Sequence, residues 1–262
     1  MRRALYWVLL LLCLCGVCAG GYLSVSQIMS YRAADRAYAD LSGYISRREG
    51  DPAAQPADIA EGGSADGISG SEGAGRIEVD FAGLEAVNPQ VVGWIYGPGT
   101  VISYPIVQAE DNSYYLHRMF NGEANGSGCI FLDAACEADF LGEHSIIYGH
   151  HMKNGTMFAS LGEYADQSYY ESHPYFQLST PGGDWRVDIF SAYVADVGQE
   201  AWQVSLGDGD SRREWIRKAG GRSAIRTGTA PKEGERILTL STCSYEFADA
   251  RFVVHGVLRP WE

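Results

Sequence analysis

Three reactive side chains lie at the ends of strand-like segments. Cys243 follows the apolar run Ile237–Leu240, which predicts a strand, so its thiol would lie at the end of a rigid element. Arg251 begins a second run, Arg251–Leu258, after a polar turn, and the two runs predict a hairpin that brings Cys243 and Arg251 side by side. His150 follows a third strand-like segment, which begins at Ser145. A thiol, an imidazole and a guanidinium can supply nucleophilic, acid–base and electrostatic catalysis.

Short strands separated by Gly, Pro and Asn dominate the chain from Arg76 onward. This pattern favours a mainly β fold, a closed barrel or a sandwich, over a parallel α/β sheet. The expected strands are Val91–Tyr96, Val101–Val107, Cys129–Leu132, His144–Tyr148, Tyr175–Leu178, Trp185–Val194, Ile237–Leu240 and Phe252–Leu258.

Three helical segments interrupt these strands. Phe81–Val87 is expected to form a short helix ended by Asn88-Pro89, and Tyr164–Ser172 a second. The third is predicted to start at Ser211, where Ser211 and Glu214 form a capping box, and to stop at Gly220-Gly221. It lies in the long connection before the Cys243 strand, the position of a lid or a groove wall.

The N-terminal part of the 262-residue chain differs from the rest in composition. Residues 4–23 are uncharged and mostly apolar, long enough to cross a bilayer core of about 30 Å as a helix. Residues 1–3 would form a cytoplasmic tip, because Arg2 and Arg3 favour a cytoplasmic N-terminus and export of the rest. The alternative is a cleaved signal peptide, with a small-residue site at Val17-x-Ala19, but the apolar run continues past it.

Two further segments separate this expected membrane anchor from the folded domain. Residues 24–48 have apolar side chains at helical spacing and predict an amphipathic juxtamembrane helix. Residues 49–75 are rich in Gly, Ala, Ser, Pro and Asp and predict a flexible linker, which leaves 76–262 as the catalytic domain. The net charge of −13 argues against nucleic acid as a partner and against a surface that lies on anionic lipid.

Several separated motifs resemble the class B sortases, cysteine transpeptidases of Gram-positive bacteria. The resemblance covers residues 76–258, and the motifs occur in the same order as in that family. They are Asn88–Ile95, Asp111–Leu116, the Tyr-Gly-His of Tyr148–His150, the doubled His150-His151 followed by Met152–Phe158, Thr239–Cys243 with serine at 241, and Arg251 eight residues after the cysteine.

The resemblance implies a fold, an activity and a set of partners. The fold would be an eight-stranded closed β-barrel with N-terminal helices and a helix before the catalytic strand. The enzyme would cleave a C-terminal sorting signal after threonine and transfer the surface protein to a cell-wall or pilin amine. It would do so outside the cell, as a single-pass membrane protein, without a cofactor.

Catalytic roles follow from the same resemblance and agree with side-chain chemistry. Cys243 would attack the amide carbonyl and form a thioester, His150 would move the protons, and Arg251 would stabilise the oxyanion or hold a substrate carbonyl. In an extended segment only one of His150 and His151 can face the thiol, and the family pattern selects His150. By resemblance, Leu116, Tyr148, Ser241 and, less directly, Asn112 line the substrate groove.

The remaining histidines and cysteines have simpler explanations. We interpret His117, His144, His173 and His255 as surface or core side chains. Cys129 and Cys136 could pair outside the cell, but two independent thiols are favoured. No ligand spacing indicates a metal site.

Two other functions fit parts of this pattern. A cysteine endopeptidase would use the same side chains and resolve the thioester with water. A tethered binding domain that has lost catalysis would have an inert Cys243. The sequence pattern identifies neither the sorting signal nor the acceptor amine.

Overall fold

A computed structural model describes residues 2–47, 75–196, 198, 200–243 and 250–261. The chain divides into two units, Met1–Ser42 and Gly43–Glu262.

The first unit is one continuous helix, α1 (Arg2–Leu41). It exposes large apolar side chains, among them Trp7, Val17 and Tyr22. Within the described residues it is long and apolar enough to cross a membrane, with a candidate span over Cys13–Tyr44 that overlaps the expected 4–23. The expected juxtamembrane helix is therefore a continuation of this helix.

That helix ends earlier than predicted. After Leu41 the chain makes a 3-10 turn, Ser42–Tyr44, and then forms strand β1 (Ile45–Arg47) instead of helix. β1 pairs antiparallel with β2 (Ile77–Val79), so the second unit begins at Gly43 and not near Arg76. A three-residue strand whose partner lies across the expected linker has no local signal, which is why the sequence pattern missed it. The expected linker, 49–75, lies outside the described residues except for Gly75.

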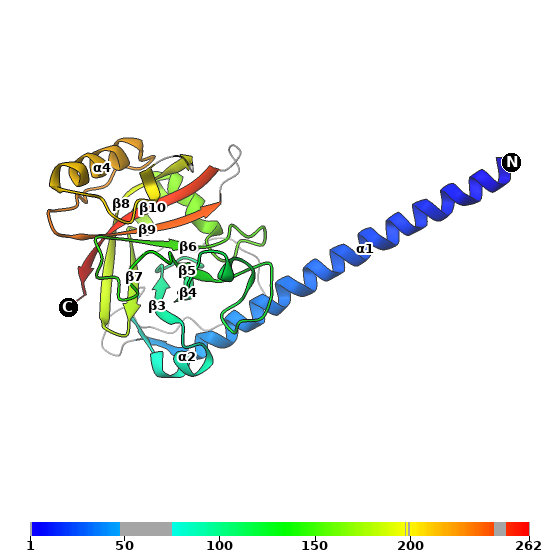
Figure 1. The fold of residues 1–262 in the computed structure, drawn as a ribbon, viewed down its shortest axis with the longest axis horizontal. Coiled ribbons are helices and arrows are strands. Elements are labelled where there is room, and N and C mark those ends of the chain that lie inside the picture. Colours follow the sequence, from blue (N-terminus) through cyan, green and yellow to red (C-terminus); the bar gives the residue numbers. More distant parts are fainter. Residues whose placement is uncertain (1, 48–74, 197, 199, 244–249, 262) are drawn as a thin grey trace. The chain divides into compact units, whose positions relative to one another are not determined.

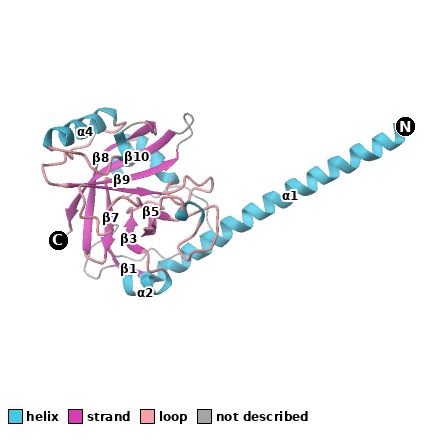
Figure 2. Cartoon of the chain, in the orientation of Figure 1, coloured by secondary structure: helices cyan, strands magenta, loops and turns pink. Residues whose placement is uncertain are grey.

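Eight strands close into a barrel, as expected (Figures 1 and 2). They are β3 (Val91–Tyr96), β4 (Ser103–Val107), β5 (Ile130–Leu132), β6 (His144–Tyr148), β7 (Tyr175–Thr180), β8 (Gly183–Asp196), β9 (Arg236–Cys243) and β10 (Ala250–Pro260). Their order around the barrel is β10-β8-β7-β3-β4-β5-β6-β9. Neighbours pair antiparallel except β4 with β5 and β6 with β9.

The short helices agree with the sequence prediction in part. Helix α2 (Phe81–Val87) has the expected bounds, because the Asp80 carboxylate accepts a hydrogen bond from the Gly83 amide and Asn88 is extended before a proline. The helix predicted over Tyr164–Ser172 is wrong as a single element. A 3-10 helix, η3 (Ala159–Ala165), precedes helix α3 (Gln167–Ser172), and the extended backbone of Asp166, which caps α3, separates them.

Helix α4 (Gly209–Arg222) confirms the predicted helix but corrects both ends. Its N-cap is Asp208 and not Ser211, since the Asp208 carboxylate accepts a hydrogen bond of 2.9 Å from the Ser211 amide. At the other end Gly220 and Gly221 stay helical, because neither adopts the left-handed conformation that would stop the helix, and Ser223 is the C-cap.

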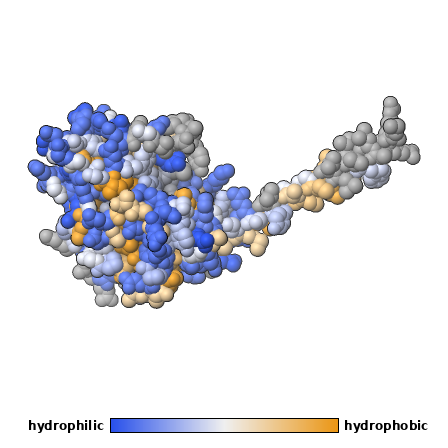
Figure 3. Space-filling model, viewed as in Figure 1, coloured by the Kyte–Doolittle hydropathy of each residue, from blue (hydrophilic) through white to orange (hydrophobic). Residues whose placement is uncertain are grey.

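Helix α4 packs on the outer face of the barrel against β8, and its buried side chains also reach β9 and β10. Trp215 and Ala219 are buried in a cluster with Ile237, Val253 and Val257. The opposite face of the helix carries exposed charged side chains, and this end of the molecule is mainly hydrophilic in Figure 3. The short 3-10 helix η4 (Glu200–Trp202) contacts α4, because the Trp215 indole donates to the Glu200 carbonyl.

Candidate active site

The strand register brings the three predicted catalytic residues to one end of the barrel. Cys243 and Arg251 are direct partners in the antiparallel β9–β10 ladder, as the predicted hairpin requires. Strand β6 runs parallel to β9 on its other side, with Tyr148 paired to Ser241. His150 lies two residues after Tyr148 and Cys243 two residues after Ser241, so the main chains of β6, β9 and β10 present His150, Cys243 and Arg251 at the same level.

This alignment continues past the last residue of β6. The Gly149 amide donates a hydrogen bond of 3.1 Å to the Ser241 carbonyl, which extends the parallel pairing toward His150. The His150 carbonyl in turn accepts from the Phe158 amide at 3.0 Å. Main-chain hydrogen bonds therefore hold the position of His150 on both sides.

His150 and His151 differ in their surroundings. The His150 Nε2 lies 2.7 Å from the Leu116 carbonyl oxygen, in the 3-10 helix η2 (Tyr114–His117). Its ring stacks against that of His117, with centroids 6.4 Å apart. His151 forms an isolated bridge with Met157 instead. His117 is exposed, in agreement with its interpretation as a surface histidine.

Arg251 occupies the second position of β10, paired to Ala195 of β8 as well as to Cys243. Its side chain is half-buried, and Nη1 donates a hydrogen bond of 3.0 Å to the Ala250 carbonyl. A guanidinium anchored in this way offers its remaining N–H groups as donors.

Two of the expected groove residues meet at a carboxylate that the sequence analysis did not single out. Asp133, which follows β5 and is buried, accepts hydrogen bonds of 2.9 Å from the Tyr148 hydroxyl and from the Asn112 amide nitrogen. The Asn112 side-chain oxygen accepts from the Ala134 amide. Burial and the adjacent Asp133 raise the pKa of Tyr148 above its ordinary range, so this hydroxyl stays a hydrogen-bond donor.

Ser241 was expected to line the substrate groove, and its surroundings differ most from that expectation. It is buried, and its hydroxyl accepts a hydrogen bond of 3.1 Å from the Trp202 indole nitrogen. Trp202 belongs to the connection that the sequence marked as a lid or groove wall, but nothing in the local pattern distinguished it from the other tryptophans. Leu116, by contrast, is half-buried beside His150.

Two histidines lie in the core beneath α4, in agreement with the sequence interpretation. The Thr239 hydroxyl lies 2.6 Å from His144 Nε2 and 2.7 Å from His255 Nδ1, and His144 Nδ1 lies 2.7 Å from the Gln203 carbonyl. Trp215 packs against both rings. Burial lowers the pKa of His144 to about 4 and that of His255 well below its usual value.

In the part of the chain that the structure describes, the other cysteines and the potential metal ligands form no further site. Cys129 and Cys136 are separate, buried thiols, as favoured from the sequence. Among the described residues, no group of three or more His, Cys, Asp or Glu side chains could hold a metal ion.

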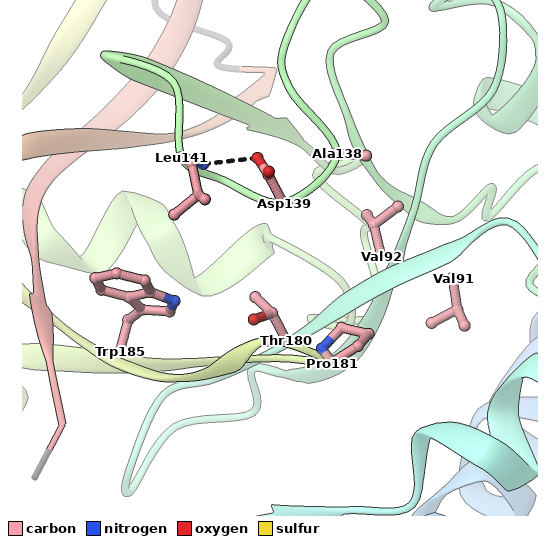
Figure 4. Close-up of a pocket in the computed structure, with 9 residues that line it drawn as sticks. Val91, Val92, Ala138, Asp139, Leu141, Thr180, Pro181 and Trp185 are labelled. Carbon is pink, nitrogen blue, oxygen red and sulfur yellow. Dashed lines mark hydrogen bonds between the residues drawn. The ribbon is translucent and has the colours of Figure 1, made fainter.

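A cavity of about 330 Å³ is lined by residues from the start of β3, from the loop before β6 and from the β7–β8 turn (Figure 4). Its lining is mostly apolar, from Val91, Val92, Leu141, Pro181 and Trp185. The Asp139 carboxylate in its wall accepts from the Leu141 amide and so stabilises its own loop.

Known proteins resemble this chain in sequence and in fold. A family model described as the sortase domain matches residues 95–259. The chain is 32% identical to a sortase B of Listeria monocytogenes over 186 residues, which cover 70% of this chain and 76% of that protein. A solved sortase B–substrate complex from Staphylococcus aureus superposes with a TM-score of 0.66 at 30% identity, covering 70% of this chain and 85% of that one.

A second solved structure, a sortase B complexed with triglycine, gives a TM-score of 0.65 at 31% identity and covers 70% of this chain and 86% of that one. The range matched by the family model includes His150, Cys243, Arg251 and the helical connection before β9. The chain belongs to the sortase family of cysteine transpeptidases and, within it, to class B.

Proposed function

We propose that this sortase is a membrane-anchored enzyme in which Cys243 is the nucleophile, His150 the proton-transfer residue and Arg251 the electrostatic stabiliser. The observation that carries this assignment is the strand register. Cys243 is the direct partner of Arg251, and the parallel β6–β9 ladder leads His150 to the same level.

The reaction needs one covalent intermediate. The Cys243 thiolate attacks the substrate carbonyl, the peptide C–N bond breaks, and the leaving amine takes a proton from His150. An acceptor amine then attacks the thioester and gives a proton back to His150, while the thiolate of Cys243 leaves. Arg251 carries a permanent charge and donates to the oxyanion that forms in each step.

The substrate is a C-terminal sorting signal, cleaved after threonine, and the acceptor is an amine of a cell-wall peptide or a pilin. The relatives solved in complex with a substrate and with triglycine support a peptide substrate and an amine acceptor. The product would be a surface protein joined to that amine by a new amide bond.

The groove for this signal would pass Leu116, Tyr148, Ser241 and Asn112. The hydroxyl of Tyr148 and the amide of Asn112 both donate to the Asp133 carboxylate, so these two side chains would mainly stabilise the wall of the groove. Ser241 is buried and its hydroxyl accepts from the Trp202 indole, so contact with a substrate would require Ser241 to become exposed.

Helix α1 would anchor the enzyme in the membrane. Its apolar, exposed length supports a single span, and Arg2 and Arg3 favour a cytoplasmic N-terminus. The second unit would then lie outside the cell.

The test uses the full-length chain in detergent, incubated with a panel of sorting-signal peptides and an excess of triglycine. Mass spectrometry should find the peptide joined to triglycine after its threonine, and no product with Cys243→Ala. His150→Ala and Arg251→Ala should each lower the rate at least about a hundredfold.

His151→Ala is the matched control and should keep most of the activity. Near-normal turnover by His150→Ala would refute the assignment of the proton-transfer residue. Cleavage without capture of triglycine would indicate a peptidase instead of a transpeptidase.

A further inference from the structure

One ring nitrogen of His150 forms a hydrogen bond with the main chain of the protein. Its Nε2 lies 2.7 Å from the Leu116 carbonyl oxygen, and a carbonyl oxygen can only accept a hydrogen bond. Nε2 therefore carries a hydrogen in the neutral ring as well as in the charged ring. The neutral ring must then have its free lone pair on Nδ1.

The Leu116 carbonyl is itself firmly held. The carbonyls on either side of it accept main-chain hydrogen bonds of 3.0 Å, Tyr115 from the Cys129 amide and His117 from the Asn125 amide. The buried Tyr115 ring is fixed through its hydroxyl, which donates to the Gln90 side chain at 2.6 Å and accepts from Asn88 at 2.9 Å. These contacts fix the main chain on both sides of the Leu116 carbonyl, which can therefore set the orientation of the imidazole.

Gly128 provides the space for this contact. Its φ is +59°, a left-handed conformation that favours glycine. A Cβ at this position would lie 2.8 Å from the carbonyl oxygens of Leu116 and Tyr115 and 2.9 Å from Cδ2 of His150. These distances are too short for a carbon atom, so any side chain at 128 would displace either the carbonyl or the imidazole.

We propose that the Leu116 carbonyl and Gly128 position His150, and that they hold its neutral ring in the tautomer with the proton on Nε2. Nδ1 is then the nitrogen that exchanges protons during the transfer. This inference rests on the proposed function and names the atom that performs its proton steps. Neither Leu116 through its carbonyl nor Gly128 touches the reacting atoms, so both are positioning residues.

The proton balance follows directly. When the peptide bond breaks, the proton leaves Nδ1 for the departing amine, and Nε2 keeps its hydrogen bond to Leu116. When the acceptor amine attacks the thioester, its proton returns to Nδ1. The imidazole need not rotate between the two steps, because the same nitrogen gives and receives the proton and the other stays anchored.

The test is nitrogen NMR of the full-length chain in detergent micelles with 15N-labelled histidine, at a pH where His150 is neutral. The His150 signals are assigned by their disappearance in His150→Asn. Nε2 should show the shift of a protonated ring nitrogen and Nδ1 that of an unprotonated one. The opposite pattern would overturn the inference, and this measurement needs no variant at Gly128 and no active enzyme.

Three variants separate the positioning role from a general structural one. Gly128→Ala should reduce the Nε2-protonated population and lower kcat at least about tenfold, since small displacements of a catalytic group are costly. Gly126→Ala is the matched control, because a Cβ there meets nothing within 4 Å. Leu116→Ala removes the side chain but keeps the carbonyl, so it should keep the tautomer even where peptide binding weakens.

An unchanged tautomer in a folded Gly128→Ala variant would overturn the role of Gly128. The inference and the proposed function also fail in different ways. A chain that shows the expected tautomer but forms no triglycine product would contradict the function alone. An active transpeptidase with the proton on Nδ1 would contradict the inference alone.

Discussion

Acid should destabilise this protein through the two histidines buried beneath α4, and the effect of His144 can be worked out from its environment. His144 Nδ1 faces the Gln203 carbonyl, which only accepts, so this nitrogen carries the proton and Nε2 accepts from the Thr239 hydroxyl. Thr239 can then accept from His255 Nδ1. In this neutral arrangement each of these hydrogen bonds has one donor.

Protonation of His144 would break this order. Its Nε2 would become a donor, so the hydrogen of the Thr239 hydroxyl would lose the acceptor that it has in the neutral arrangement. These groups are buried, so that hydrogen either stays unsatisfied or turns to His255 Nδ1 and moves the His255 proton to Nε2, which has no hydrogen-bond partner among the described residues. Burial, with a smaller contribution from Arg212, accordingly lowers the pKa of His144 to about 4.

The sign and size of the effect follow from linkage. The unfolded chain, with a histidine pKa of about 6.5, binds a proton at a higher pH than the folded chain does. His144 therefore contributes no penalty well above pH 6.5 and destabilises the fold progressively as the pH falls toward 4. The loss amounts to about 2 kcal/mol at pH 5 and about 3 kcal/mol below pH 4.

The assay is urea unfolding of the full-length chain in detergent at pH 7 and pH 5, followed by tryptophan fluorescence. His144→Gln keeps a donor and an acceptor but does not titrate, so its free energy of unfolding should fall by about 2 kcal/mol less than that of the wild type between the two pH values. His117→Gln, at an exposed position, is the control. An equal loss in wild type and His144→Gln would refute the reasoning.

Three further predictions concern the groove wall, the end of β6 and the buried thiols. Tyr148→Phe removes a donor from the buried Asp133 carboxylate and should lower the free energy of unfolding by about 1–3 kcal/mol; an unchanged urea midpoint would contradict it. Gly149→Ala places a Cβ 2.5 Å from Ile130 Cδ1 and should cost about 1–3 kcal/mol, whereas Gly162→Ala, with open space around it, should not. Because burial raises the pKa of Cys136 to about 11 and Cys129 is also buried, peptide mass spectrometry should find neither alkylated at pH 7.5 until urea is added.

The local sequence was enough to predict the elements of the barrel. Alternating and β-branched residues located all eight strands, most of them to within two residues, because strand formation on a half-buried surface is visible in such runs. The β9–β10 hairpin could be predicted as well, since its two strands are close in sequence. Helix α2 was predicted with its bounds because both of its end signals are local.

Helix ends and distant pairings were predicted less well. Asp208 competes with Ser211 for the start of α4, and only the folded backbone shows which side chain accepts the capping hydrogen bond. Strand β1 has three residues and no pattern of its own, and it ends at Arg47, whereas its partner β2 begins only at Ile77. Such contacts depend on chain closure over a long segment and leave no periodic trace in the sequence.

The candidate site, too, could be predicted only in part from the sequence. The sequence by itself determined which side chains could react, because a thiol, an imidazole and a guanidinium at strand ends have few other uses in this pattern, and it determined the hairpin that joins Cys243 to Arg251. Only the tertiary structure decided that β6 lies parallel to β9 and so brings His150 to that hairpin, that the Trp202 indole donates to Ser241, and that Asp133 accepts from both Tyr148 and Asn112. The physical reason is that these contacts connect segments distant in the chain, and their geometry exists only once the barrel has closed.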